Sequence, residues 1–128
     1  MTQANPLNIF KGPDSVAQYF DPDLQPPLPL VELPAKLNPF RSDNVRIYAK
    51  ILTALPAQNV KALPALNMLL HEPGAAKKSI VEASSGSTVL SLDMVSRVLW
   101  GNDDVCAYVT NKKHPDQLRI LRFFGLKM

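Results

Sequence analysis

The sequence predicts an α/β protein: a three-layer α/β/α arrangement around a parallel sheet, with strands near residues 45–51, 79–83 and 104–109. Two observations support this fold class. Short apolar runs alternate with longer amphipathic segments from residue 45 onward. Proline and glycine stand at the positions where such helices begin and end. Strand–helix alternation of this kind favours a parallel sheet with right-handed crossovers.

Composition bounds the protein class. A chain of 128 residues suggests one domain, and 46% hydrophobic with 20% charged residues is typical of a globular protein. The net charge of +3 is too small to indicate nucleic-acid binding. The single cysteine, Cys106, excludes an internal disulfide, and the two histidines lie far apart in the sequence. We therefore expect no metal site.

Prolines divide the chain, because eight of the twelve lie in residues 1–39. Proline fixes φ and removes a backbone donor, so we expect neither regular helix nor central strand there. Residues 1–40 are predicted to be a proline-rich extended arm, and residues 41–128 an α/β domain. The alternatives are an arm packed on the domain and a flexible tail. The packed arm is favoured by four apolar side chains: Leu28, Leu30, Val31 and Leu33.

The first half of the domain shows a strand, a helix and a second strand. "VRIYAKIL", residues 45–52, alternates apolar and polar positions, which predicts a strand. Residues 59–70 carry apolar positions at helical spacing, and Pro64 is tolerated only in the first turn of that helix. Residues 79–84, "SIVEAS", form a short apolar run that predicts the second strand.

The second half repeats the alternation. Residues 85–101 predict a helix that ends at Gly101. Residues 104–110, "DVCAYVT", predict a strand buried on both faces. Residues 114–125 predict a last helix, with a proline near its start and a glycine after its end. The apolar face of the helix over residues 85–101 consists of Val89, Leu92, Val95 and Leu99.

Small and hydroxyl residues gather at the junction of the second strand and its helix: Ser84, Ser85, Gly86, Ser87 and Thr88. Ligands of open α/β sheets bind at the carboxyl ends of strands. The first N–H groups of a helix lack internal partners and suit a carboxylate or phosphate. The alternative is that one serine caps the helix and the others are solvated.

Lys61 also lies at a predicted strand-to-helix junction. A lysine amine at such a place could form a Schiff base with a carbonyl cofactor. The alternative is a solvated surface charge, and spacing alone does not decide between them.

Three segments resemble one family. "PLPLVELP" (residues 27–34), "IYAKILTALPAQNVKALPALNML" (residues 47–69) and "VEASSGST" (residues 81–88) are similar to the N-terminal part of cysteine synthase-like enzymes. These are fold-type II pyridoxal-phosphate enzymes, related to the tryptophan synthase β-chain. Their motifs read T-P-L-V-x-L, then K-x-E-x-x-N-P-x-x-S-x-K-D-R, then E-x-T-S-G-N-T-G. The positions that match the last two motifs are Lys50, Pro56, Lys61, Glu82, Ser85, Gly86 and Thr88.

The resemblance implies roles for these residues. Lys61 corresponds to the lysine that bonds pyridoxal phosphate and later moves the α-proton. Residues 84–88 correspond to the loop that holds the substrate α-carboxylate, and Ser87 stands where the family has an asparagine that contacts the cofactor. The implied chemistry is β-elimination or β-replacement on an amino acid, a lyase type of reaction in amino-acid metabolism.

The sequence also departs from the family pattern. Ala62 and Leu63 replace the Asp-Arg pair after the lysine, and Val89 replaces a glycine after the loop. The family's second domain, with its glycine-rich phosphate loop, has no counterpart in these 128 residues. We therefore expect a truncated or half enzyme, inactive alone, that binds pyridoxal phosphate weakly.

Two alternatives remain open. One is a non-catalytic module that binds a small anion or a partner protein, and the other is an unrelated α/β domain whose motifs match by chance. Expected partners are a small amino-acid substrate or anion, and a second copy or a second domain, but neither nucleic acid nor a membrane. Without a signal-peptide pattern at the N-terminus, we expect a cytoplasmic protein.

Overall fold

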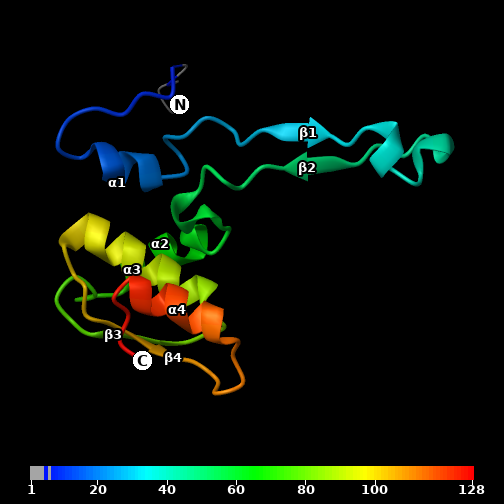
Figure 1. Ribbon diagram of the computed structural model, residues 1–128. Coiled ribbons are helices and arrows are strands. Elements are labelled where there is room, and N and C mark those ends of the chain that lie inside the picture. Colours follow the sequence, from blue (N-terminus) through cyan, green and yellow to red (C-terminus); the bar gives the residue numbers. More distant parts are fainter. Residues whose placement is uncertain (1–4, 6) are drawn as a thin grey trace.

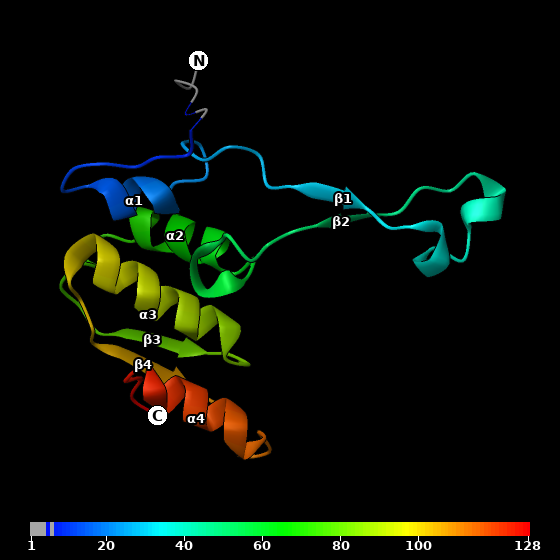
Figure 2. The same ribbon diagram turned by 45° about the horizontal axis from the view of Figure 1, so that its top comes forward.

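The computed structural model describes residue 5 and residues 7–128 (Figure 1). A body of helices and strands carries a long hairpin that extends away from it (Figures 1 and 2). The body contains α1 (Ser15–Phe20), α2 (Ala62–His71), β3 (Ile80–Ala83), α3 (Ser87–Trp100), β4 (Val105–Tyr108) and α4 (Pro115–Phe123). The hairpin contains β1 (Leu30–Glu32) and β2 (Tyr48–Lys50), with short 3-10 turns at Ala35–Leu37 and Arg41–Asp43.

The body confirms the α/β class and the parallel sheet. β3 and β4 pair in parallel, with Ile80 opposite Val105. Lys127 adds a second parallel pairing, an isolated bridge to Cys106, so the segment at Lys127 lies where a third strand of this sheet would begin. The predicted order of strand, helix, strand, helix over the last 50 residues is therefore confirmed.

Helices cover one face of this sheet. Val105 and Ala107 of β4 point to the same face, where they pack with Val89 of α3 and Leu121 of α4. On the opposite face, Val81 is 57% exposed and Tyr108 is 66% exposed. The expectation that "DVCAYVT" would be buried on both faces is therefore wrong. A helical layer on that second face is not formed by the described residues.

A second apolar cluster stacks α1 and α2 on the outer side of α3 (Figure 2). Leu66 and Leu69 of α2 contact the predicted apolar face of α3, so burial of these side chains stabilises the helix pair. Pro64 lies in the first turn of α2, as its missing donor requires. The cluster consists of Phe20, Ala65, Leu66, Leu69, Ala75, Leu92 and Val95.

The strand predicted at residues 45–52 is not part of the parallel sheet. It forms β2, which pairs antiparallel with β1, so that Leu30 faces Lys50 and Glu32 faces Tyr48. Alternation of period two is common to both kinds of pairing, and therefore it predicts a strand without predicting its partner.

The expectations for residues 1–40 need two corrections. A helix, α1, forms between Pro13 and Pro22, because eight consecutive residues there are free of proline. The arm lies on the domain only in part: Phe20 of α1 packs against α2 and α3, whereas Leu30 and Val31 are exposed on the hairpin. No helix of the described residues has the length and apolar character needed to cross a membrane.

Candidate functional site

Lys61 stands at the entrance to α2, and its side chain is exposed. The preceding turn, Pro56–Gln58 (η3), contains two non-glycine residues with positive φ, Ala57 at 55° and Gln58 at 52°. Such left-handed residues are uncommon and are held by their surroundings. Here the Asn59 side chain holds them: its Nδ2 donates to the Ala57 carbonyl at 2.8 Å, and its Oδ1 accepts from the Lys61 N–H at 2.8 Å.

The predicted hydroxyl-rich junction does lie between β3 and α3. Ser84 continues the strand pairing, because its N–H donates to the Tyr108 carbonyl at 3.2 Å. Its hydroxyl accepts from the N–H groups of Gly86 at 3.0 Å and Val89 at 3.4 Å. One serine therefore satisfies donors at the start of α3, as the capping interpretation expects.

The remaining loop positions keep donors available. Among the described residues, the N–H groups of Ser87 and Thr88 have no protein acceptor. Ser85 and Ser87 are exposed, and Thr88 is half-buried. Gly86 has φ of +127°, a conformation that favours glycine. Because glycine has no side chain, a ligand can approach the backbone closely at this point. Capping by Ser84 and anion binding by the other residues are therefore compatible.

Asn59 joins the turn of Lys61 to the first turns of α3. The Ser91 hydroxyl lies 3.4 Å from Asn59 Oδ1 and 2.8 Å from the Ser87 carbonyl oxygen. Ser91 is fully buried, so this contact is shielded from water. The Ser91 hydroxyl donates to the Ser87 carbonyl, and its contact with Asn59 shows that the turn before Lys61 packs beside the start of α3.

Helix α4 supplies a wall that the sequence analysis missed. A pocket of about 140 Å³ lies against the loop. Its lining comes from the loop (Ser85, Gly86, Ser87) and from α4 (Gln117, Ile120, Leu121). Lys61 is not among these lining residues, so the pocket accommodates a group near the loop rather than a ligand that reaches the lysine.

Lys113 brings positive charge to the same loop. Its Nζ lies 3.6 Å from the position that a Cβ on Gly86 would take, and 3.4 Å from Gln117 Oε1. The segment "TNKKHPDQ" could have indicated this position of Lys113 from the sequence. It follows the strand next to β3, and therefore reaches the same sheet edge as the loop.

The clearest pKa shifts lie away from this loop. Burial raises the pKa of the Asp93 carboxyl, while the hydrogen bond from Arg97 opposes that rise. Hydrogen bonds from Lys127 and Ser79 lower the pKa of Asp104. The ion pair between Lys127 and Asp104, with Nζ 2.5 Å from Oδ1, raises the pKa of Lys127. Asp104, Ser79 and Lys127 join β3, β4 and the segment at Lys127, whereas Asp93 and Arg97 lie on α3.

Comparison with protein families shows a match over most of the chain. The model of the family described as pyridoxal-phosphate dependent enzyme matches residues 23–128. Among curated proteins, no sequence matches the chain. The matched range includes both Lys61 and the loop at residues 84–88.

Proposed function

Because the chain belongs to the pyridoxal-phosphate dependent enzyme family, we propose that it supplies the lysine and the substrate-carboxylate loop of an amino-acid β-elimination or β-replacement site. The observation that carries this proposal is the Asn59–Ser91 contact. It shows that the turn of Lys61 lies beside the helix that begins with the loop, although the two are distant in sequence. The finer family, cysteine synthase-like or tryptophan synthase β-like, rests on the motifs alone.

The chemical groups of the candidate residues fit pyridoxal phosphate and its amino-acid substrate. Lys61 offers an exposed primary amine, the group that bonds an aldehyde carbon. The loop offers hydroxyls and free helix N–H groups, which suit a carboxylate. The 140 Å³ pocket is smaller than the roughly 300–1,000 Å³ typical of sites for larger organic ligands. We therefore expect the described residues to form one wall of the site, and binding of the cofactor to this chain to be weak.

Each residue has a distinct task. Pyridoxal phosphate, when bound, supplies the electron sink that makes the substrate α-proton acidic. Lys61 provides the amine that holds the cofactor and the base that moves this proton. The N–H groups of Ser87 and Thr88 hold the substrate carboxylate, with Lys113 adding positive charge beside Gly86. Ser87 replaces the motif's asparagine, so one cofactor contact is altered.

Chemical trapping tests the proposal. The chain is incubated with pyridoxal phosphate and reduced with borohydride, and the labelled lysine is found by tryptic mapping. We expect low-affinity labelling concentrated at Lys61, and negligible turnover of O-acetylserine. Each charge-assisted hydrogen bond to the cofactor that is lost costs about 1.5–3 kcal/mol. Two lost hydrogen bonds therefore weaken the binding of pyridoxal phosphate by orders of magnitude.

The matched controls are K61R and K112Q, of which only the first should abolish the specific label. Equal labelling of Lys61 and the exposed lysines would show ordinary surface amine chemistry and reject the catalytic assignment. Robust turnover by this chain alone would contradict the claim that it forms one wall.

A second candidate function is anion binding without catalysis. It is favoured by the pocket itself, which joins the loop to Gln117 of α4 and does not include Lys61. Specific binding of a carboxylate at Ser87, combined with unspecific lysine labelling, would support this function over the first.

We also propose that the uncovered sheet face associates with a second copy or with a second domain. Val81 and Tyr108 lie on that face and are 57% and 66% exposed. Exposed apolar patches of this kind mark interfaces or aggregation sites. Light scattering of the isolated chain should show a dimer or larger species, and a monomer at high concentration would contradict this proposal.

A further inference from the structure

The wall that α4 contributes to the loop pocket has to be held against α3. Near the middle of α4, Leu121 is buried beside Val89 and provides an apolar anchor. At the end of α4, the chain turns at Phe124 and Gly125 toward the segment at Lys127. In the described part of the chain, one side-chain hydrogen bond joins α3 to this turn, and it comes from Arg97.

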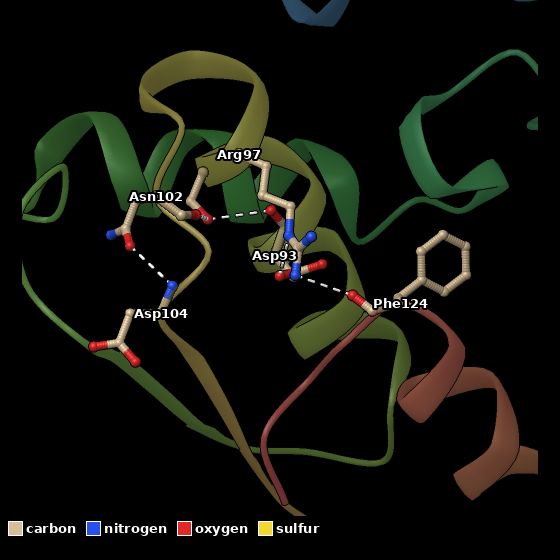
Figure 3. Close-up of polar contacts among 6 residues, drawn as sticks. Asp93, Arg97, Asn102, Asp104 and Phe124 are labelled. Carbon is tan, nitrogen blue, oxygen red and sulfur yellow. Dashed lines mark hydrogen bonds and ion pairs between the residues drawn. The ribbon is translucent and has the colours of Figure 1, made fainter.

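Arg97 makes contacts in two directions (Figure 3). Its Nε donates to Asp93 Oδ1 at 2.8 Å, one turn earlier on α3. Its Nη2 donates to the Phe124 carbonyl at 3.0 Å. A planar guanidinium donates in both directions at once, whereas an ammonium acts as a single charged point. The two helices are therefore joined through one side chain.

Two further features fit this contact. Asp93 is only 1% exposed, and a buried carboxylate is costly unless it is paired, so its position beside Arg97 compensates that cost. Gly125 has φ of +80°, and a Cβ there would lie 3.2 Å from Arg97 Nη2. A side chain at residue 125 would therefore crowd the guanidinium.

We infer that Arg97, fixed by Asp93, is a positioning residue for the candidate site. It holds the end of α4, and thereby the orientation of Gln117 and Ile120 opposite the loop at residues 85–87. The functional part of this inference rests on the proposed function, while the mechanical part does not. Loss of the Phe124 contact should loosen the turn that leads to the segment at Lys127 and change the pocket wall while the body stays folded.

Amide hydrogen exchange and ¹H–¹⁵N NMR test the mechanical part. The Leu126 N–H donates to the Leu121 carbonyl, and the Lys127 N–H donates to the Val105 carbonyl. In R97M, exchange at these two amides should rise about tenfold or more beyond any rise in α2, which reports the global loss of stability from leaving Asp93 unpaired. The amide signals of Gln117 and Ser87 should shift. R97K should keep the ion pair with Asp93. Exchange at the Leu126 and Lys127 amides should nevertheless stay faster than in the wild-type protein.

R122M is the matched control, because Arg122 lies in the last turn of α4 and is exposed. It should leave Leu126 and Lys127 unchanged. Equal effects of R97M and R122M, or a uniform rise of exchange over the whole body, would overturn the inference. If R97M does not fold, the variants R97K and D93N decide instead. Wild-type protection of the Leu126 and Lys127 amides in R97K would also overturn the inference.

Pyridoxal-phosphate trapping separates the two proposals. If Lys61 of the wild-type protein is labelled specifically, its labelling should be weaker in R97M. In R122M it should equal that of the wild-type protein. If wild-type labelling is unspecific, the proposed function fails, and the exchange data still judge the role of Arg97.

Discussion

The hairpin β1–β2 and the α/β body are built on opposite principles. The body buries its apolar side chains: Val89, Val95 and Val105 are inaccessible to solvent. The hairpin instead exposes Leu30 and Val31 and buries a polar residue, Asn38, at 2% exposure. Asn38 Nδ2 donates to the Val45 carbonyl at 2.8 Å, and its Oδ1 accepts from the Phe40 N–H at 3.1 Å.

This difference shows which forces hold each region. Burial of apolar area stabilises the body, at about 25 cal/mol per Å². The hairpin relies on local hydrogen bonds, each worth only about 0.5–1.5 kcal/mol net. Isolated two-stranded hairpins are at best marginally stable in water. The body is therefore expected to unfold as the cooperative unit, and the hairpin to open locally at lower free energy.

Paired truncations give the largest expected contrast. L92A removes a side chain that is 3% exposed from the cluster between α2 and α3. It should lower the free energy of unfolding by about 2–5 kcal/mol, as for other buried leucines. L30A removes a side chain that is 63% exposed on the hairpin and should change that free energy by no more than about 0.5 kcal/mol. Urea denaturation followed by far-UV circular dichroism measures both.

A large loss of stability in L30A would break the comparison. It would show that Leu30 of the hairpin is covered in solution, at a surface other than the sheet face proposed to associate. A small loss in L92A would instead show that the cluster between the helices contributes little to the cooperative unit.

The body was predictable because its signals are local. Apolar residues at helical spacing, a proline in the first turn of α2 and Gly101 with φ of +68° after α3 each determine structure within a few residues. The exposed second face of the sheet was not predictable from β4, because its sequence is apolar at Cys106 and Tyr108 whether or not a layer covers them.

The hairpin was mispredicted because pairing is not local. Residues 45–52 and the prolines near residue 30 contain no information on which strand pairs with which. The proline count also concealed α1, since the helix needs only the proline-free interval between Pro13 and Pro22. A total over 39 residues cannot locate such an interval.

The positions of the candidate site residues were predicted in part, and their roles stay a prediction. The loop at residues 84–88 and Lys61 lie at the helix starts that the sequence indicated. The contact between them was not predictable, since Asn59 and Ser91 are 32 residues apart and carry no periodic signal. Gln117 and Lys113 were missed for the same reason: their proximity to Gly86 comes from the packing of α4 beside α3.

The smallest expected effect concerns the ion pairs of the hairpin. Glu32 accepts from Arg41 at 2.7 Å and lies 3.6 Å from Arg46, and all three side chains are partly or largely exposed. Pairs of this kind contribute about 0–1 kcal/mol and are screened by salt. E32Q should therefore leave the urea midpoint of the body unchanged.

Hydrogen exchange should nevertheless detect E32Q locally. The Leu33 N–H donates to the Ile47 carbonyl beside Glu32, so its exchange should rise at low salt and approach that of the unmodified protein at high salt. E72Q is the matched control, because Glu72 is exposed at the end of α2 and belongs to the body. It should leave Leu33 unaffected. A shift of the whole urea curve in E32Q would show that the hairpin and the body unfold together, because a local opening cannot change the stability of the cooperative unit.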